Sequence, residues 1–387
     1  MADGMNKPAI RFAGFTDAWE QRKVQDVADR FDNLRIPVAA NLRVHGTTPY
    51  YGANGIQDYV EGFTHDGEFV LVAEDGANDL KNYPVKCVNG RIWVNNHAHV
   101  LQGKAGIADN SFLAFAINQS DIESLLVGGG RAKLNAETLM SIEFRLPCLQ
   151  EQYRIGEYLT QLDHLITLHQ REYAKLVNIK ASMLEKMFPK DGSAYPEVRF
   201  AGFTDAWEQR KFEDLYDYAS EGGTPDTNNP AFYEGGKIPF VKIEDTVEKY
   251  IDSPKSYITE EGMNHSSAWL IPKGNVIFTN GATVGNVSIN RLPVTTKQGI
   301  LGIIPSKKVT SEFLFYLLSS TEFQREVRSR MATGTFATII LKSLNEIPVC
   351  FPSNTNEQES IITILSKLDN LITLHQRERI LHEIQNN

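Results

Sequence analysis

The stretch RFAGFTDAWEQRK occupies residues 11–23 and recurs without a change at residues 199–211, 188 residues later. A second stretch, LDHLITLHQRE at 162–172, returns as LDNLITLHQRE at 368–378, 206 residues later and with one substitution. We call the first repeated stretch the frame and the segment that follows it the insert; the second repeated stretch belongs to an expected helix. The two inserts are dissimilar, so the chain has the order frame, insert and helix, followed by the same three parts again. Recurrence of this kind is typical of tandem structural units. The sequence therefore predicts two half-proteins in which one scaffold carries two different recognition surfaces.

Length and composition indicate a globular chain with more than one domain. At 387 residues the chain is too long for one ordinary hydrophobic core, and the repeat independently indicates two. No run approaches the roughly 18 apolar residues of a membrane-spanning helix, and the first residues lack the apolar segment of a signal peptide. The three cysteines, Cys87, Cys148 and Cys350, lack metal-like or redox-like spacing, which fits a reducing compartment. We expect a cytoplasmic protein.

The net charge of −9 argues mildly against a nucleic-acid partner, because most free-standing DNA-binding proteins are basic. The objection is met if the basic residues lie on one face of the protein. It is also met if partner subunits supply most of the phosphate contacts.

Each frame leads into an insert of mixed secondary structure. Trp19 and Trp207 stand at matched positions of the frame, where we expect them to anchor the start of each domain in its core. Residues 24–148 and 212–350 contain short runs of alternating apolar and polar residues between Gly-rich turns, which predict antiparallel or mixed sheets, together with helical stretches. Each insert is therefore expected to form an α/β (α+β) domain.

A long amphipathic helix follows each insert, introduced by Glu151-Gln152 and again by Glu357-Gln358. Apolar residues recur there at heptad spacing, which predicts a coiled coil whose seam also includes His169 and His375 as polar interruptions. The chain order requires the two helices to run antiparallel. A helix of roughly 35 residues would hold the domains on the order of 50 Å apart, and one turn of B-DNA measures roughly 34 Å. The expected seam residues are Leu159, Leu162, Ile166, Leu176, Leu365, Leu368 and Ile372.

These motifs, repeated in a fixed order around two unlike inserts, resemble the specificity (S) subunit of type I restriction-modification systems. The resemblance covers essentially the whole chain. It implies two α/β target recognition domains joined by two long helices in an antiparallel coiled coil, a pseudo-twofold tandem repeat. The implied boundaries are a first target recognition domain at 1–149, a central helical region at 150–190, a second target recognition domain at 191–350 and a distal helical region at 351–387.

The resemblance also implies function and partners. In that family each recognition domain reads one half of a bipartite, asymmetric sequence in double-stranded DNA, and the helices set the spacing and dock two methyltransferase (M) subunits. Restriction (R) subunits complete the full complex. S-adenosylmethionine, ATP and Mg are expected on the partner subunits, and no cofactor or metal is expected on this chain.

Several short motifs are similar to loops of the family's recognition domains. GTTPYYGANG at 46–55 and GGTP at 222–225 look like domain openings, while GRIWVNNHAHVL at 90–101, GATVGN at 281–286 and KQGI at 297–300 are similar to domain subtypes. Base edges are read mainly by Arg, Lys, Asn, Gln and Ser/Thr, and phosphates are held by Lys, Arg and backbone amides. The candidate DNA-binding residues are Tyr50, Tyr51, Asn54, Lys81, Lys86, Arg91, Thr224, Lys242, Asn280, Lys297 and Gln298.

Catalytic motifs are weak. Asn229-Pro230-Ala231-Phe232 differs by one residue from the Asn-Pro-Pro-Phe motif of adenine methyltransferases, but it follows a polar turn and no Gly-rich cofactor loop opens a helix. We predict a turn there and no catalytic residue. Two alternatives remain open: a self-sufficient DNA methyltransferase or nuclease, and a coiled-coil protein-interaction scaffold that does not contact DNA.

Overall fold

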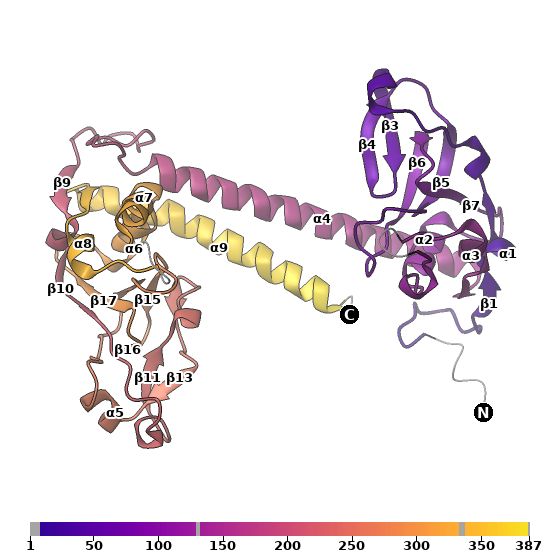
Figure 1. Cartoon of the computed structure of the whole chain (residues 1–387). Helices are drawn as coiled ribbons and strands as arrows, with labels where there is room; N and C mark the ends of the chain where they lie inside the picture. Colours follow the sequence, from indigo (N-terminus) through magenta and orange to yellow (C-terminus); the bar gives the residue numbers. More distant parts are fainter. Residues whose placement is uncertain (1–7, 129–131, 333–336, 386–387) are drawn as a thin grey trace. The chain divides into compact units, whose positions relative to one another are not determined.

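The computed structural model describes residues 8–128, 132–332 and 337–385, with side chains described up to residue 377. The chain forms two compact units, Met1–Thr167 (unit 1) and Leu168–Asn387 (unit 2). Each unit contains one copy of the repeated frame and one insert (Figure 1). The prediction of an α/β tandem repeat is confirmed.

The repeated Glu-Gln-Arg-Lys segment forms the same small sheet in both units. In unit 1, β1 (Glu20–Lys23) pairs antiparallel with β8 (Glu143–Leu146), the strand that closes the insert. In unit 2, β9 (Glu208–Lys211) pairs antiparallel with β18 (Pro348–Phe351). Each frame therefore holds both ends of its insert together.

The insert of unit 1 is built on a six-stranded sheet in the order β2-β7-β5-β6-β3-β4. The ladders are antiparallel except that between β3 and β6, which is parallel. The strands are β2 (Ala28–Arg30), β3 (His45–Gly52), β4 (Gly55–Val60), β5 (His65–Ala73), β6 (Val85–Val94) and β7 (Ala98–Gly103). The helical elements are α1 (Val24–Val27), η1 (Asp32–Leu34), η2 (Ala40–Leu42), α2 (Asn110–Asn118), η3 (Glu123–Leu125) and α3 (Ala136–Ser141).

Strand β5 is buried on both faces, which explains its continuous apolar run FVLVA. Val70 and Val72 pack into the core beneath α2, whereas Phe69 and Leu71 pack into a second cluster on the opposite face. Successive side chains of a strand point to opposite faces, so a run without polar alternation requires cover on both sides. Helix α2 supplies the cover on one side, against β5 and β6 (Figure 1).

The insert of unit 2 has different sheets. Five strands take the order β10-β17-β14-β15-β12, and a second, three-stranded sheet takes the order β13-β11-β16. The strands are β10 (Tyr216–Glu221), β11 (Ile238–Val241), β12 (Tyr250–Ile251), β13 (Ser256–Ile258), β14 (Val276–Thr279), β15 (Val287–Asn290), β16 (Thr295–Thr296) and β17 (Ile300–Pro305). The helical elements are η4 (Phe212–Leu215), η5 (Pro230–Phe232), η6 (Ile243–Asp245), α5 (Glu260–Asn264), α6 (Ser311–Ser319), α7 (Thr321–Arg330) and α8 (Leu341–Asn345).

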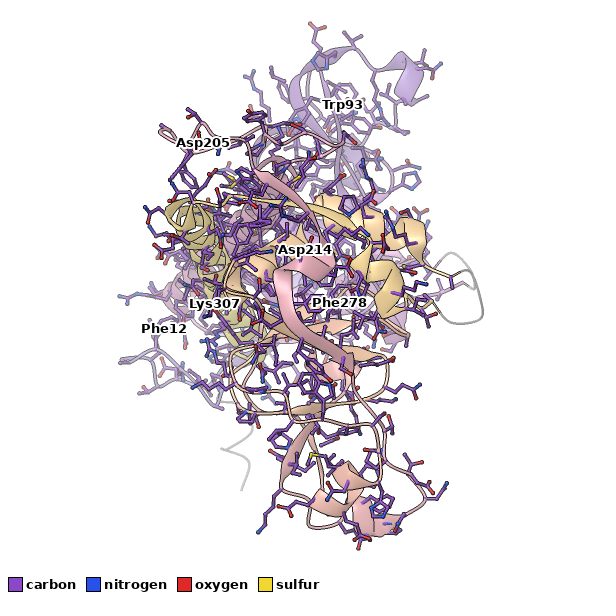
Figure 2. The ribbon with its side chains drawn as sticks, turned by 90° about the vertical axis from the view of Figure 1, so that its left-hand side faces the viewer. Phe12, Trp93, Asp205, Asp214, Phe278 and Lys307 are labelled. Carbon is purple, nitrogen blue, oxygen red and sulfur yellow. The ribbon has the colours of Figure 1, made fainter. Side chains whose placement is uncertain are left out.

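The core of unit 2 also lies on both sides of its central strand, β14. Val276 and Phe278 join a large cluster with Phe313 of α6, and Ile277 joins a smaller cluster on the other face. Figure 2 shows Phe278 of this core together with Asp214 of η4. The Asp214 carboxylate accepts a hydrogen bond from the backbone N–H of Lys211 at the turn after β9.

Two long helices, α4 (Leu149–Lys186) and α9 (Thr355–Gln385), carry the second repeated motif. Within unit 2 the part of α4 from Leu168 onward runs antiparallel to α9: Nδ1 of His169 lies 3.1 Å from Nδ1 of His375, and farther along α4 Lys180 pairs with Asp369 at 2.6 Å. The predicted antiparallel pair is confirmed, with both histidines at its seam. In the part of the chain that the structure describes, no helix is long and apolar enough to cross a membrane.

Candidate nucleic-acid interface

In each unit a buried ion pair joins the repeated frame to the start of the long helix. Arg11 donates from Nε and Nη2 to the two carboxylate oxygens of Glu151, both at 2.7 Å, and Arg199 binds Glu357 in the same way at 2.7 and 2.9 Å. The Glu151 and Glu357 side chains are 0% and 2% exposed. The hydrogen bonds to these carboxylates raise the pKa of both arginines. In both units, therefore, the arginine of the first repeated motif binds the glutamate in the first turn of the long helix.

The glutamine that follows each of these glutamates ties the helix start to its insert. Gln152 donates from Nε2 to the carbonyls of Pro147 (2.9 Å) and Ile107 (3.0 Å). Gln358 donates in the same way to Pro352 and Lys308, both at 2.9 Å. Each Glu-Gln pair therefore fixes the orientation of an insert relative to the first turn of its own helix.

In unit 2, two of the motifs singled out from the sequence, GGTP and KQGI, meet the end of β11 at one loop cluster. The hydroxyl oxygen of Thr224 accepts a hydrogen bond from the backbone N–H of Gln298 (3.3 Å), and the N–H of Lys297 donates to the carbonyl of Val241 (2.9 Å), next to Lys242. Lys297 and Gln298 are exposed, and Thr224 and Lys242 are half-buried. The structure therefore brings these four predicted residues together.

Glycines allow this close approach of backbones. A Cβ on Gly222 would lie 2.0 Å from the carbonyl oxygen of Thr296, so no larger residue fits without displacing that strand. Gly299 has φ +87°, a left-handed conformation that favours glycine, and its N–H donates to the Glu221 carboxylate at 2.6 Å. The glycines of GGTP and KQGI thus allow the backbones of these two loops to pack closely against their neighbours.

Asn280 does not present its side chain at this surface. It is 5% exposed, at the end of β14, and its Nδ2 donates to the carbonyl of Ile339 (3.2 Å) while its backbone N–H donates to Gly299 (2.9 Å). The prediction that Asn280 contacts DNA is corrected, because Asn280 is buried directly after β14. Its hydrogen bonds instead connect the start of the GATVGN loop to Ile339 and Gly299.

Tyr50 and Tyr51 require the same correction in unit 1, because they are 1% and 7% exposed. The Tyr50 hydroxyl accepts a hydrogen bond from the N–H of Val38 (2.9 Å), and its ring stacks on Trp93 with centroids 6.4 Å apart. Burial raises the pKa of the Tyr51 hydroxyl. Both are core residues of β3, since this strand lies between β4 and β6.

Three predicted residues of unit 1 lie around the loop between β5 and β6 and the β3–β4 hairpin. Asn54, at the hairpin tip, donates from Nδ2 to the carbonyl of Gly76 and accepts from the N–H of Asn78, both at 2.9 Å. Asn54 and Lys86 line the same shallow cavity of about 140 Å³. Lys81 is exposed on the loop itself.

Arg91 lies elsewhere. It is exposed on β6 five residues beyond Lys86, about 17 Å along the strand. Its Nε lies 3.2 Å from an oxygen of Asp66, and its guanidinium lies 4.8 Å from the ring centre of Phe63. The structure does not bring Arg91 together with the hairpin residues.

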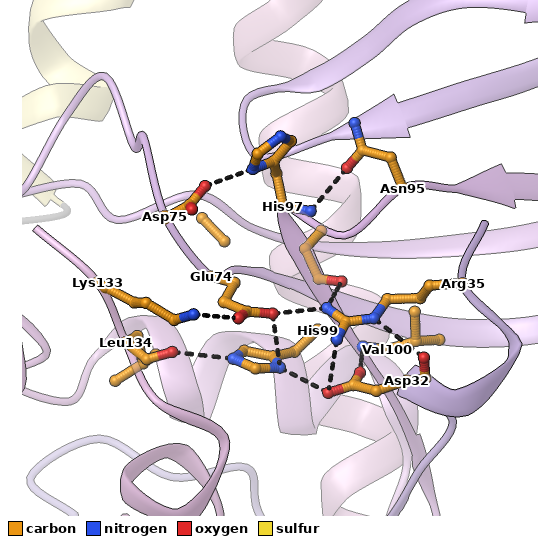
Figure 3. Close-up of polar contacts among 12 residues, drawn as sticks. Asp32, Arg35, Glu74, Asp75, Asn95, His97, His99, Val100, Lys133 and Leu134 are labelled. Carbon is orange, nitrogen blue, oxygen red and sulfur yellow. Dashed lines mark hydrogen bonds and ion pairs between the residues drawn. The ribbon is translucent and has the colours of Figure 1, made fainter. Parts of the chain in front are cut away.

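A buried polar network surrounds His99 of β7, which lies in the stretch GRIWVNNHAHVL, and none of its members was a candidate DNA-binding residue (Figure 3). His99 is 1% exposed; its Nδ1 lies 2.7 Å from a carboxylate oxygen of Asp32, and its Nε2 lies 2.9 Å from the carbonyl oxygen of Leu134. The other oxygen of Asp32 accepts from the N–H of Val100 at 2.8 Å. The network ties η1, β7 and the segment before α3 together.

Glu74 extends this network at the end of β5. It accepts hydrogen bonds from Arg35 (2.7 Å) and Lys133 (2.8 Å). Burial raises the pKa of Asp32 and Glu74, but the hydrogen bonds and cationic neighbours outweigh it and hold each carboxyl pKa below its ordinary value. Among the residues with described side chains, no group of three or more His, Cys, Asp or Glu could hold a metal ion.

The helices expose leucines that the heptad analysis did not select. Leu165 and Leu168 of α4 are 44% and 41% exposed, and their repeat counterparts in α9, Leu371 and Leu374, are 44% and 51% exposed. These positions flank the seam. The predicted seam residues Leu365 and Leu368 are buried and Leu176 packs against the same core, while Leu159, Leu162, Ile166 and Ile372 are half-buried.

The motif resembling that of adenine methyltransferases forms a turn, as predicted. The Asn229 side chain caps η5 by accepting a hydrogen bond from the N–H of Ala231 at 3.2 Å, and Phe232 is 8% exposed. An asparagine engaged in capping and a buried ring suit a structural role.

Comparisons with known proteins agree with this architecture. Residues 16–178 and 204–386 each match the family model of the type I restriction modification DNA specificity domain. A putative type I restriction enzyme specificity subunit from Haemophilus influenzae is 30% identical over 358 residues, covering 91% of this chain and 88% of that protein. The EcoR124I/EcoR124II specificity subunit from Escherichia coli is 31% identical over 154 residues, covering 39% of this chain and 38% of that protein. The crystal structure of a type I restriction-modification S subunit from M. genitalium has the same fold, with a TM-score of 0.65, 15% identity, and coverage of 96% of this chain and 94% of that one.

Proposed function

This chain belongs to the type I restriction modification DNA specificity family, and we propose that each of its two inserts reads one half of a bipartite, asymmetric DNA sequence. The observation that carries the proposal is the contrast between frame and insert. Identical frame segments hold a six-stranded sheet in one unit and a five-stranded plus a three-stranded sheet in the other. Two unlike surfaces on a shared scaffold suit two unlike half-sites.

Exposed polar loops support the assignment of the reading surfaces. In unit 2, Lys297 and Gln298 project from a loop cluster whose backbone groups are satisfied by Thr224 and Val241. In unit 1, Asn54, Lys81 and Lys86 are exposed around one hairpin and one loop. Lys and Gln side chains suit phosphate and base-edge contacts, respectively.

The exposed leucines of the helices support docking of protein partners. Apolar side chains that remain exposed at repeated positions suit burial against another subunit. Two methyltransferase subunits and, in the full complex, restriction subunits are the partners we propose. On this assignment S-adenosylmethionine, ATP and Mg belong to those partners, this chain has no catalytic role, and the complex acts in the cytoplasm.

Exchange of one insert tests the proposal. Residues 24–142 lie between β1 and β8, so replacing them with the corresponding insert of another family member preserves the frame sheet. We expect that co-expression with the methyltransferase subunit changes one half of the methylated sequence and leaves the other half unchanged. Mapping methylated adenines across host DNA measures this. A change in both halves, or methylation without sequence preference, contradicts one insert per half-site and would favour a scaffold role.

A further inference from the structure

The stretch GRIWVNNHAHVL, at 90–101, forms the end of β6, a short turn and the first part of β7, and His97 is the last residue of that turn. Nδ1 of His97 lies 2.5 Å from Oδ1 of Asp75, in the loop after β5 (Figure 3). The His97 side chain is 35% exposed and that of Asp75 is 22% exposed. A carboxylate therefore holds this imidazole at the surface of unit 1.

Two other histidines of the same sheet are fully engaged within the fold. His65 of β5 and His99 of β7 are 2% and 1% exposed, and both nitrogens of each ring lie within hydrogen-bond distance of a partner. His97 uses only Nδ1, because its Nε2 has no hydrogen-bond partner among the residues that the structure describes. One ring nitrogen of His97 is thus left for a ligand.

Backbone hydrogen bonds fix the turn that carries His97. Its N–H donates to Oδ1 of Asn95 at 2.8 Å, and its carbonyl accepts from the N–H of Glu74 at 2.9 Å. Because Asp75 also holds the ring, both the backbone and the side chain of His97 are oriented before a ligand binds. Such preorganisation lowers the entropic cost of binding and is typical of recognition residues.

His97 lies beside the unit 1 residues assigned above to DNA reading. Asn54, at the tip of the β3–β4 hairpin, donates to the carbonyl of Gly76 in the loop after β5. Ala98, the residue after His97, lines the same shallow cavity as Asn54 and Lys86. The hairpin, the loop after β5 and the turn after β6 therefore meet at one surface.

The carboxylate of Asp75 determines what the free nitrogen can bind. An ionised carboxylate only accepts hydrogen bonds, so Nδ1 of His97 carries the proton between the two groups. In the neutral imidazole Nε2 is then an acceptor. In the major groove of DNA, the groups that donate to an acceptor are the exocyclic amines, N4 of cytosine and N6 of adenine. Phosphate oxygens offer no proton, so a base edge is the ligand that fits.

We propose that His97 is a specificity-determining residue whose Nε2 accepts a hydrogen bond from the exocyclic amine of one base, and that Asp75 is the residue that positions its ring. The base belongs to the half-site that the unit 1 insert reads, so this inference rests on the function proposed above. A direct base contact specifies one base pair and leaves the other positions of the half-site to other residues.

Paired substitutions separate the two ring nitrogens. In His97→Asn the amide can still donate to Asp75 but has no atom at the position of Nε2, whereas the longer side chain in His97→Gln reaches that position. After co-expression with the methyltransferase subunit, His97→Asn should lower discrimination at one base pair of one half-site at least about fivefold, and His97→Gln should retain more of it. Mapping methylated adenines across host DNA measures both. Unchanged discrimination in His97→Asn, or an equal loss in both variants, overturns the assignment to Nε2.

Asp75 has its own test. An asparagine can still accept from Nδ1 of His97, so Asp75→Asn should keep the discrimination, and Asp75→Ala should lose it at the same base pair as His97→Asn. A loss at other base pairs, or over the whole half-site, would show that Asp75 does not act through His97.

A matched control and a stability measurement exclude a purely structural effect. His45→Asn changes an exposed histidine at the start of β3, roughly 20 Å along the strand from the hairpin tip, and should leave every base pair unchanged. The Tm of each variant should equal that of the unmodified chain. A lower Tm for His97→Asn with unchanged discrimination would assign His97 a structural role and contradict the proposal.

The exchange of residues 24–142 distinguishes failure of this inference from failure of the proposed function. If the exchange changes one half-site but His97→Asn changes no position, the insert reads DNA without His97. If the exchange changes both halves or neither, the proposed function itself is wrong.

Discussion

Glu357 accepts hydrogen bonds from three donors, two on Arg199 and one on Trp207, while its side chain is 2% exposed. We expect Glu357→Gln to lower the unfolding free energy of unit 2 by about 3 kcal/mol, the low end for a broken buried ion pair because Arg199 is partly exposed. Thermal or urea unfolding followed by circular dichroism measures the change. Glu359→Gln, on the same helix but exposed, is the control and should be neutral. Equal stability of the two variants would show that the pair contributes nothing.

The Asp32 network predicts acid sensitivity in unit 1. The pKa values of Asp32 and Glu74 are lowered in the fold, so their ionised forms stabilise it above about pH 4, the ordinary carboxyl range. This stabilisation is lost as the pH falls through the folded-state pKa. Asp32→Asn should therefore lower the Tm at pH 7, and its difference from the unmodified chain should shrink at pH values below about 4.

Melting curves at neutral and acidic pH test this expectation. Asp29→Asn changes an exposed carboxylate nearby and should have little effect at either pH. A Tm difference for Asp32→Asn that is equally large at both pH values would mean that ionisation of Asp32 is not the source of its effect.

At the scale of elements, a single carboxylate joins three helices of unit 2. Asp369 of α9 accepts from the Tyr316 hydroxyl of α6 (2.6 Å) and pairs with Lys180 of α4 (2.6 Å) and with the half-buried Lys249 (3.5 Å). Asp369→Asn should lower the unfolding free energy by about 1.5–3 kcal/mol, the range for hydrogen bonds to charged groups. Urea unfolding measures this change.

The repeat offers a matched control for this change. Asp163 is the counterpart of Asp369 in α4; it is exposed and has no ion pair among the described residues. Asp163→Asn should therefore be neutral. If both substitutions cost the same, the three-helix junction is not what makes Asp369 important.

The exposed leucines belong to the same scale. Leu371→Glu combined with Leu374→Glu should weaken co-purification with the methyltransferase subunit at least about tenfold, because charged groups would be buried at the proposed interface. Thr373→Glu places a charge on an exposed position between them and serves as the control. The Tm of the isolated chain should be unchanged in both. If the double variant assembles normally, Leu371 and Leu374 are not part of the docking surface.

For the whole molecule, the sequence predicted the parts that depend on local pattern. The tandem frames, the α/β inserts and the antiparallel pair of long helices followed from repetition, turn residues and heptad spacing. The contact between GGTP and KQGI could not be predicted from either motif by itself. Their contact depends on backbones that approach across some 70 residues of chain, and no local pattern encodes such a contact.

The sequence by itself determined that the chain is built twice on one frame, since identical segments with the same local preferences adopt the same strand and pair with the same closing strand. Only the tertiary structure decided which candidate residues are reachable, because burial depends on neighbours distant in sequence: Tyr50, Tyr51 and Asn280 lie in the core, and Lys297 does not. It also separated two tryptophans that the sequence cannot distinguish. Trp207 is covered by Phe188 from the end of α4, while Trp19, in an identical segment, borders an open cavity.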